Sequence, residues 1–202
     1  MTQALPVFSQ IEPSQIKARV EQLIAACTAD IEAVVKEPNP SWQSLIVALE
    51  ENSDELGKFW SPVSHLNSVK NSPELREAYE SCLPLLSDFG TYVGQHEGLY
   101  QAYLKLSHSA EYATLTTAQQ KVIQNALRDF KLSGIGLSDE KKQRYGEIQS
   151  RSSDLASSFS NNTLDATQAW FKHIEDESLL SGLPEDAKLA AAEAAAQKEL
   201  SG

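Results

Sequence analysis

The stretch Pro13-Ser-Gln-Ile-Lys-Ala-Arg-Val-Glu-Gln-Leu-Ile-Ala-Ala-Cys-Thr-Ala-Asp-Ile-Glu-Ala-Val-Val35 decides the fold class of this chain. Its large apolar residues recur at the spacing of one buried face of an α-helix. Pro13 opens the run and Pro38 follows it, so residues typical of helix boundaries lie at both ends. The apolar positions of this predicted helix are Ile16, Val20, Leu23, Ile24, Cys27, Ile31, Val34 and Val35.

The same helical period continues after this segment. A second helix is predicted from Ser41 to Trp60, with acidic residues on the face opposite its apolar stripe. Ser61-Pro62 should end that helix, because proline lacks the N–H that a helix interior needs. A short helix over 63–69 is expected to follow.

A third helical run begins where Ser72 and Pro73 supply an N-cap and a first-turn proline. It extends to about Tyr103, and Pro84 within it predicts a kink or a break. Two later helices have apolar positions spaced for burial, which in the second are Tyr145, Ile148, Leu155 and Phe159. The polar run Ser160-Asn161-Asn162 weakens the prediction of helix at the end of the second one. The remaining predicted helices cover 116–134, 138–160 and about 184–199.

One short strand is also predicted, Ala169–Ile174, because this segment is rich in aromatic residues. A lone strand cannot satisfy its own backbone groups, so we expect Trp170 or Phe171 to be more exposed than a typical core aromatic. The predicted fold is all-α, an antiparallel multi-helix bundle with at most one short strand near the C-terminal part. We expect a helical domain over 1–168, followed by the strand and an Ala-rich helix over 169–202.

Composition excludes several classes of partner. The chain has 202 residues, of which 41% are hydrophobic, and this is enough for a sizeable core. Its 17 Lys and Arg against 28 Asp and Glu give a net charge of −11, which argues against nucleic acid and against an anionic membrane surface. We find neither a membrane-spanning run nor a secretory signal, so we expect a cytoplasmic protein.

The nearest approach to a catalytic motif is His96-Glu97-Gly98-Leu99-Tyr100. A zinc peptidase needs His-Glu-x-x-His, in which two imidazoles one helical turn apart hold the metal, and here Tyr100 occupies the second position. We interpret His96 as a partly buried structural residue and Glu97 as solvated. The other histidines are isolated in the sequence, so we predict no catalytic, metal-binding or cofactor-binding residue in this chain. They are His65, His108 and His173.

The remaining candidate functional residues are two cysteines and one polar segment. Cys27 and Cys82 are too few for a disulfide framework and form no C-x-x-C motif, so we expect small buried thiols. The segment Ser61–Asn71 has two interpretations. It is either a surface that contacts peptides or a connection between helices that its Ser and Asn side chains cap.

The segment Ser61-Pro-Val-Ser-His-Leu-Asn-Ser-Val-Lys-Asn-Ser-Pro-Glu-Leu-Arg-Glu-Ala-Tyr79 resembles the N-terminal region of a bacterial member of the thimet-oligopeptidase family of zinc metallopeptidases. Further segments resemble the same region in the same order, and together they cover nearly the whole chain. These segments are Asp88–Tyr100, Asn125–Leu137, Arg144–Ile148, Ser160–Thr167 and Leu180–Glu185.

The resemblance implies that this chain is an N-terminal fragment of a zinc metalloendopeptidase that hydrolyses short peptides in the cytoplasm. Members of the family carry His-Glu-x-x-His, a third glutamate ligand and the transition-state-stabilising residues in their C-terminal half. No residue of this chain matches them, so the resemblance assigns no zinc to the fragment and zinc to the parent enzyme only. Its partners would be the missing C-terminal catalytic domain and, for the parent, short peptides.

Two hypotheses therefore remain for the function. In the first, the N-terminal helices form one catalytically silent wall of the channel that admits short peptides, as the resemblance implies. In the second, the chain is a free-standing helical module that binds peptides or a partner helix. The two hypotheses differ on whether the reading frame continues past Gly202 to a His-Glu-x-x-His motif.

Overall fold

The computed structural model of the protein describes residues 5–200. Within these residues the chain forms seven α-helices, α1 to α7, with short helical turns between some of them and no strand. The prediction of an all-α fold is confirmed. The chain divides into two compact units, one ending at Ser158 and the other beginning at Phe159. No helix within 5–200 is both long enough and apolar enough to cross a membrane.

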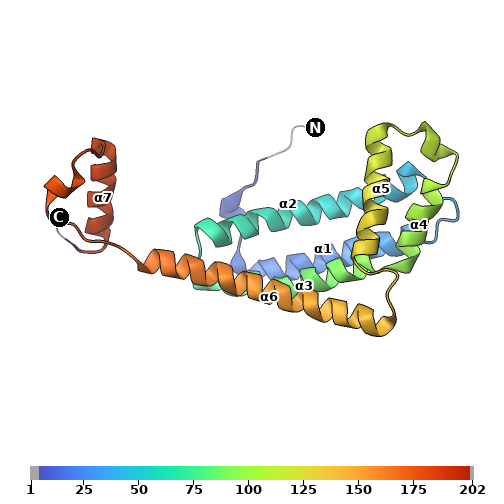
Figure 1. Cartoon of the computed structure of the whole chain (residues 1–202), viewed down its shortest axis with the longest axis horizontal. Helices are drawn as coiled ribbons and strands as arrows, with labels where there is room; N and C mark the ends of the chain where they lie inside the picture. Colours follow the sequence, from blue (N-terminus) through green and yellow to red (C-terminus); the bar gives the residue numbers. More distant parts are fainter. Residues whose placement is uncertain (1–4, 201–202) are drawn as a thin grey trace. The chain divides into compact units, whose positions relative to one another are not determined.

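Three long helices of the first unit lie side by side, and each runs antiparallel to the next one in the chain (Figure 1). The first of them contacts both of the others. Two shorter helices pack on each other at one end of this trio (Figure 1). In chain order the five helices are α1 (Pro13–Val34), α2 (Ala48–Val69), α3 (Pro73–Gly94), α4 (Glu97–Ser107) and α5 (Thr117–Leu132).

The apolar stripe of α1 runs through the whole core of the first unit. Ile16 and Val20 pack with Val63 of α2 and with Leu75 and Cys82 of α3. One to two turns further along, Leu23 and Cys27 pack with Leu56. Ile31 and Val34 then join the largest cluster, to which α4 and α5 contribute Leu99, Ala102, Leu106, Ile123 and Phe130. The helix predicted from Pro13 to Val35 is therefore the element that connects all parts of the core.

Local signals define the starts of α3 and α5 as the sequence predicts. The helical run predicted to continue to about Tyr103 instead ends at Gly94, and α4 begins as a separate helix at Glu97. The Ser72 hydroxyl accepts a hydrogen bond of 3.2 Å from the Leu75 N–H, and Pro73 follows as the first residue of α3. Thr116 and Gln119 form a reciprocal capping box at the start of α5. Just after α5, Gly134 has a φ of +86°, a left-handed conformation that glycine adopts without strain.

The break predicted at Ser61-Pro62 is wrong, because α2 continues through Pro62 to Val69. A proline inside a helix costs about 3 kcal/mol, so the neighbouring contacts must offset this cost. Pro62 and Val63 are both buried, and Trp60 stacks on Tyr79 of α3 with ring centroids 4.9 Å apart. Likewise α3 is unbroken at Pro84.

The last long helix, α6 (Asp139–Ala169), also differs from its prediction. It passes through Ser160-Asn161-Asn162 without ending. The Thr163 hydroxyl donates a hydrogen bond of 2.9 Å to the Phe159 carbonyl one turn earlier. None of its 31 residues is buried. The apolar residues expected to be buried are largely exposed, with Ile148 at 51%, Leu155 at 51% and Phe159 at 74%. Periodicity identified an apolar face here, but the described residues leave it largely exposed.

The second unit holds the end of α6, an irregular segment, a short 3-10 turn (Glu177–Leu180) and α7 (Glu185–Gln197). The strand predicted at Ala169–Ile174 is wrong: Ala169 ends α6 and residues 170–176 are neither helix nor strand. A strand needs a second strand to pair with, and residues 5–200 contain none. The exposure prediction is confirmed, since Trp170 is 73% and Phe171 51% exposed.

Two glycines one turn apart on α3 allow a direct test of this packing. A Cβ at Gly90 would meet no atom within 4 Å, so Gly90→Ala should stabilise the protein by about 0.5–1 kcal/mol through helix propensity. A Cβ at Gly94 would lie 2.6 Å from Cβ and Oγ of Ser133, so Gly94→Ala should destabilise by about 1–3 kcal/mol. Urea unfolding of both variants measures these free energies, and a loss of stability in Gly90→Ala would contradict the packing.

Candidate functional site

The structure places His96, the histidine of the motif that comes nearest to a zinc site, at the junction of three helices. Its side chain lies beside Glu32 of α1 and Tyr92 of α3, and it forms the N-cap of α4. The Tyr92 hydroxyl donates to Glu32 Oε1 at 2.8 Å, and His96 Nε2 lies 3.3 Å from the same oxygen. The Tyr92 ring meets the imidazole edge-on, with centroids 5.1 Å apart.

Both nitrogens of the His96 ring are engaged. Nδ1 accepts a hydrogen bond of 3.1 Å from the Leu99 N–H, which is one of the N–H groups that a helix start leaves without an intrahelical partner. Nδ1 must then be unprotonated, so Nε2 carries the proton and donates to Glu32. A catalytic base or a metal ligand needs a free nitrogen lone pair, and His96 has none. We conclude that His96 acts here as a helix cap.

The electrostatics of this cluster follow from the same contacts. Burial, together with the hydrogen bond to Glu32, raises the pKa of Tyr92 to about 12. The hydrogen bonds from Tyr92 and then from His96 lower the pKa of the exposed Glu32 carboxyl. Tyr92 therefore stays a neutral donor and Glu32 an ionised acceptor at neutral pH, which suits a structural contact between α1 and α3.

The other residues of the segment His96–Tyr100 lie in different environments. Glu97 is exposed and accepts a hydrogen bond of 2.9 Å from Gln101 Nε2. Tyr100 packs edge-on against Phe130 of α5, with ring centroids 5.7 Å apart. Among the residues that the structure describes, no three His, Cys, Asp or Glu side chains come close enough together to hold a metal ion. The residues present do not fit a zinc site of the kind that the family resemblance implies for its members.

The remaining candidates are the two cysteines and the segment Ser61–Asn71. Cys27 and Cys82 are buried and free, as predicted, and burial raises the pKa of both thiols. The segment Ser61–Asn71 does not connect two helices for most of its length, because residues 61–69 form the last turns of α2. Asn67 is buried and accepts on its side-chain oxygen a hydrogen bond of 2.8 Å from Asn71 Nδ2. Other residues of the segment, such as His65, Ser68 and Val69, are exposed, so a surface that contacts peptides stays a prediction.

Comparison with known families gives the class of the protein. Residues 20–142 match the family described as "Neurolysin/Thimet oligopeptidase, N-terminal domain", which is more than half of the chain. The chain belongs to this family.

The chain is also similar in sequence to individual members of this family. The chain is 60% identical over 200 residues to "Oligopeptidase A" of Haemophilus influenzae and 55% identical over 199 residues to "Oligopeptidase A" of Escherichia coli. It is 32% identical to "Probable cytosolic oligopeptidase A" of Arabidopsis thaliana. These alignments cover 96–99% of this chain but only 28–29% of each relative. The chain thus spans less than a third of the length of the curated relatives it matches.

A pair of substitutions at His96 tests its role as a cap. We expect His96→Ala to destabilise the protein by about 1 kcal/mol, because the Leu99 N–H loses its acceptor. His96→Asn should be milder, because asparagine is a favoured N-cap residue and restores an acceptor. Urea unfolding at neutral pH provides the measurement. If the two variants were equally destabilised, the contact with Glu32 and not the cap would be the main contribution of His96.

Proposed function

We propose that this chain is the non-catalytic N-terminal part of a zinc-dependent oligopeptidase related to oligopeptidase A, which cleaves short peptides in the cytoplasm. In this proposal residues 1–168 form one helical wall of the substrate channel, and residues 169–202 lead toward the catalytic domain. The zinc and the catalytic residues belong to that domain and lie outside this chain. No residue of this chain takes part in the chemical step.

One observation carries the proposal. The chain matches oligopeptidase A at 55–60% identity over nearly its whole length, while it spans only 29% of the length of those relatives. The family it belongs to is described as an N-terminal domain. A segment this similar to one part of a longer enzyme is best explained as the same part of a similar enzyme.

The exposed apolar side chains support the same proposal. In the first unit Ile148 and Leu155 on α6 are each 51% exposed, and in the second unit Phe159 and Trp170 are more exposed still. Large apolar groups at helical spacing along a helix without a buried residue are typical of a surface that another part of a protein covers. The C-terminal catalytic domain of the same polypeptide is the partner that the relatives' greater length suggests.

A free-standing helical module that binds peptides or a partner helix is the second candidate. It is favoured by the three buried core clusters of the first unit, which α1 connects. The reading frame discriminates between the two candidates. The peptidase proposal requires that the frame continues past Gly202 to a His-Glu-x-x-His motif, and a stop codon soon after Gly202 would favour the module.

The isolated chain should not cleave peptides, with or without added zinc. The reason is that both nitrogens of His96 are engaged and that no trio of ligands converges in the described part of the chain. A quenched fluorogenic peptide at saturating zinc is a suitable assay, and the chain extended along its own reading frame is the positive control. Turnover by the isolated chain that a chelator abolishes would refute the assignment of the chemistry to another domain.

Zinc should also leave the melting temperature of the isolated chain unchanged. A ligand that binds only the folded state stabilises it by about 2.7 kcal/mol at a hundredfold excess over its dissociation constant, which is easily seen in a thermal melt. Calorimetry with zinc, and again after a chelator is added, provides the comparison. A reversible rise of several degrees would reveal a zinc site within this chain.

A further inference from the structure

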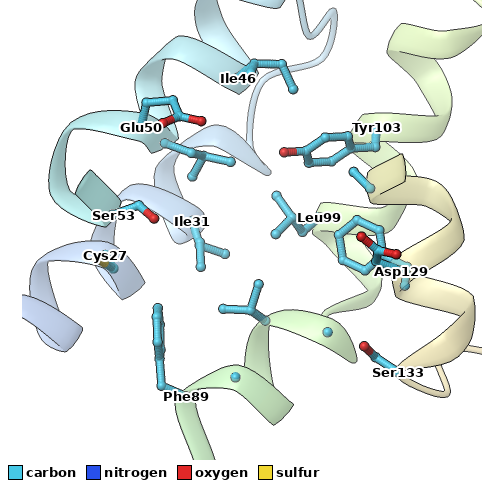
Figure 2. Close-up of a pocket in the computed structure, with 16 residues that line it drawn as sticks. Cys27, Ile31, Ile46, Glu50, Ser53, Phe89, Leu99, Tyr103, Asp129 and Ser133 are labelled. Atoms are coloured by element: carbon cyan, nitrogen blue, oxygen red, sulfur yellow. The ribbon is translucent and has the colours of Figure 1, made fainter. Parts of the chain in front are cut away.

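The first unit contains a cavity of about 490 Å³ between α1, α2, α3, α4 and α5 (Figure 2). This volume falls in the range of about 300–1,000 Å³ that is typical of sites for small organic molecules. Most of its wall is apolar. Each of the five helices contributes apolar side chains, among them Ile31, Leu49, Phe89, Val93, Leu99 and Phe130. Ile46, from the short helical segment Trp42–Val47 that precedes α2, lines the space as well.

Two glycines of α3 form part of the wall. Gly90 and Gly94 lie one helical turn apart and both line the cavity. Gly94 allows α3 to approach the end of α5 so closely that a Cβ at this position would lie 2.6 Å from the Ser133 side chain. At Gly94 the wall of the cavity is therefore backbone, next to a close contact between α3 and the end of α5.

The charged side chains that line the cavity are both carboxylates, those of Glu50 and Asp129. Figure 2 shows the Tyr103 hydroxyl pointing from α4 into the space between α4 and α2, with the Glu50 carboxylate on the α2 side and Asp129 on α5. Asp129 is paired with Arg128 at 2.8 Å, whereas Glu50 forms no ion pair with any described residue. None of the described residues that line the cavity is Lys, Arg or His.

The Tyr103 hydroxyl lacks a hydrogen-bond partner among the described residues. Burial, followed by the charge of Glu50, raises the pKa of Tyr103 to about 12, so the phenol stays neutral at physiological pH. A neutral phenol oxygen accepts a hydrogen bond from an ammonium group, and an ionised carboxylate nearby adds electrostatic attraction. A polar group that faces an apolar cavity without a partner is the arrangement expected of a ligand site.

We propose that this cavity binds a small organic cation, namely a primary ammonium group on a short apolar body. The apolar part would lie against Ile31, Leu99 and Phe89, and the ammonium group would lie between Tyr103 and Glu50. An anion is disfavoured because the cavity offers it carboxylates and no cation. The site uses residues of the first unit alone, so it does not depend on the proposed peptidase function.

Nuclear magnetic resonance of the isolated chain tests the proposal residue by residue. Titration with 2-phenylethylamine should shift the amide signals of Gly90 and Gly94, which line the cavity, and leave those of Gly57 and Gly182 in place. Two related small molecules serve as controls. Ethylamine has the charge without the apolar body, and 3-phenylpropionate has the apolar body with the opposite charge, so both should shift these signals much less. Equal shifts with 3-phenylpropionate, or no shift at Gly90 and Gly94 with the amine, would overturn the proposal.

A matched pair of substitutions tests the role of the charge. Glu50→Gln removes the carboxylate that lines the cavity, and Glu51→Gln removes its exposed neighbour, which does not line it. Glu50→Gln should raise the dissociation constant of 2-phenylethylamine about two- to five-fold, the range expected for a partly exposed ion pair, and Glu51→Gln should leave it unchanged. Both side chains are on the surface, so both variants are expected to fold. Identical dissociation constants for the two variants would contradict the assignment of Glu50.

The same titration separates two sources of such a cation. Phenylalaninamide imitates the free amino terminus of a peptide that begins with an apolar residue, and N-acetylphenylalaninamide is its neutral counterpart. If phenylalaninamide binds and the acetylated compound does not, the cavity accepts a peptide amino terminus. If 2-phenylethylamine alone binds, the site is specific for free amines. If none of the amines shifts the signals of Gly90 and Gly94, the cavity is not a cation site.

Discussion

The apolar stripe of α1 is the constraint on which the rest of the first unit depends. Six of its residues are buried, and they take part in all three core clusters, so α1 connects the α2–α3 end of the unit with the α4–α5 end. Full burial of an aliphatic side chain contributes about 1.5–3 kcal/mol, and α1 has more buried residues than any other helix within 5–200. The positions of His96 and of the cavity follow from it, because Glu32 and Ile31 both come from α1.

Much of the fold could be predicted because helix periodicity and capping residues are local signals. The spacing from Ile16 to Val34 correctly predicted α1, and Ser72 and Thr116 correctly marked the starts of α3 and α5. The end of α3 at Gly94 was not predicted. The errors have tertiary causes. In α2, burial of Pro62 and stacking of Trp60 on Tyr79 offset the free-energy cost of a proline inside a helix. In α6, the described residues leave the apolar face largely exposed. Trp170 and Phe171 are residue types common in strands, but residues 5–200 contain no second strand with which they could pair.

The candidate site was harder to predict, because its contacts join residues far apart in the sequence. The sequence distinguishes His96-Glu97 from a zinc motif, because Tyr100 stands at the position of the second histidine. It did not reveal that His96 caps α4 or that Glu32 and Tyr92 lie beside it, 64 and 4 positions earlier in the chain. A histidine just before an apolar helix and three residues ahead of Leu99 was the one local signal. The cavity had no local signal at all, because five helices contribute to it.

In the first unit α1 organises the core, whereas the described residues leave the apolar face of α6 exposed. Native-state hydrogen exchange tests both parts at once, because it measures the free energy of opening for each amide. The amides of Ile16–Ile31 should exchange only through global unfolding. Those of α6 should exchange through local opening, which requires a much smaller free energy. Protection of the α6 amides equal to that of the α1 amides would contradict this description of the two helices.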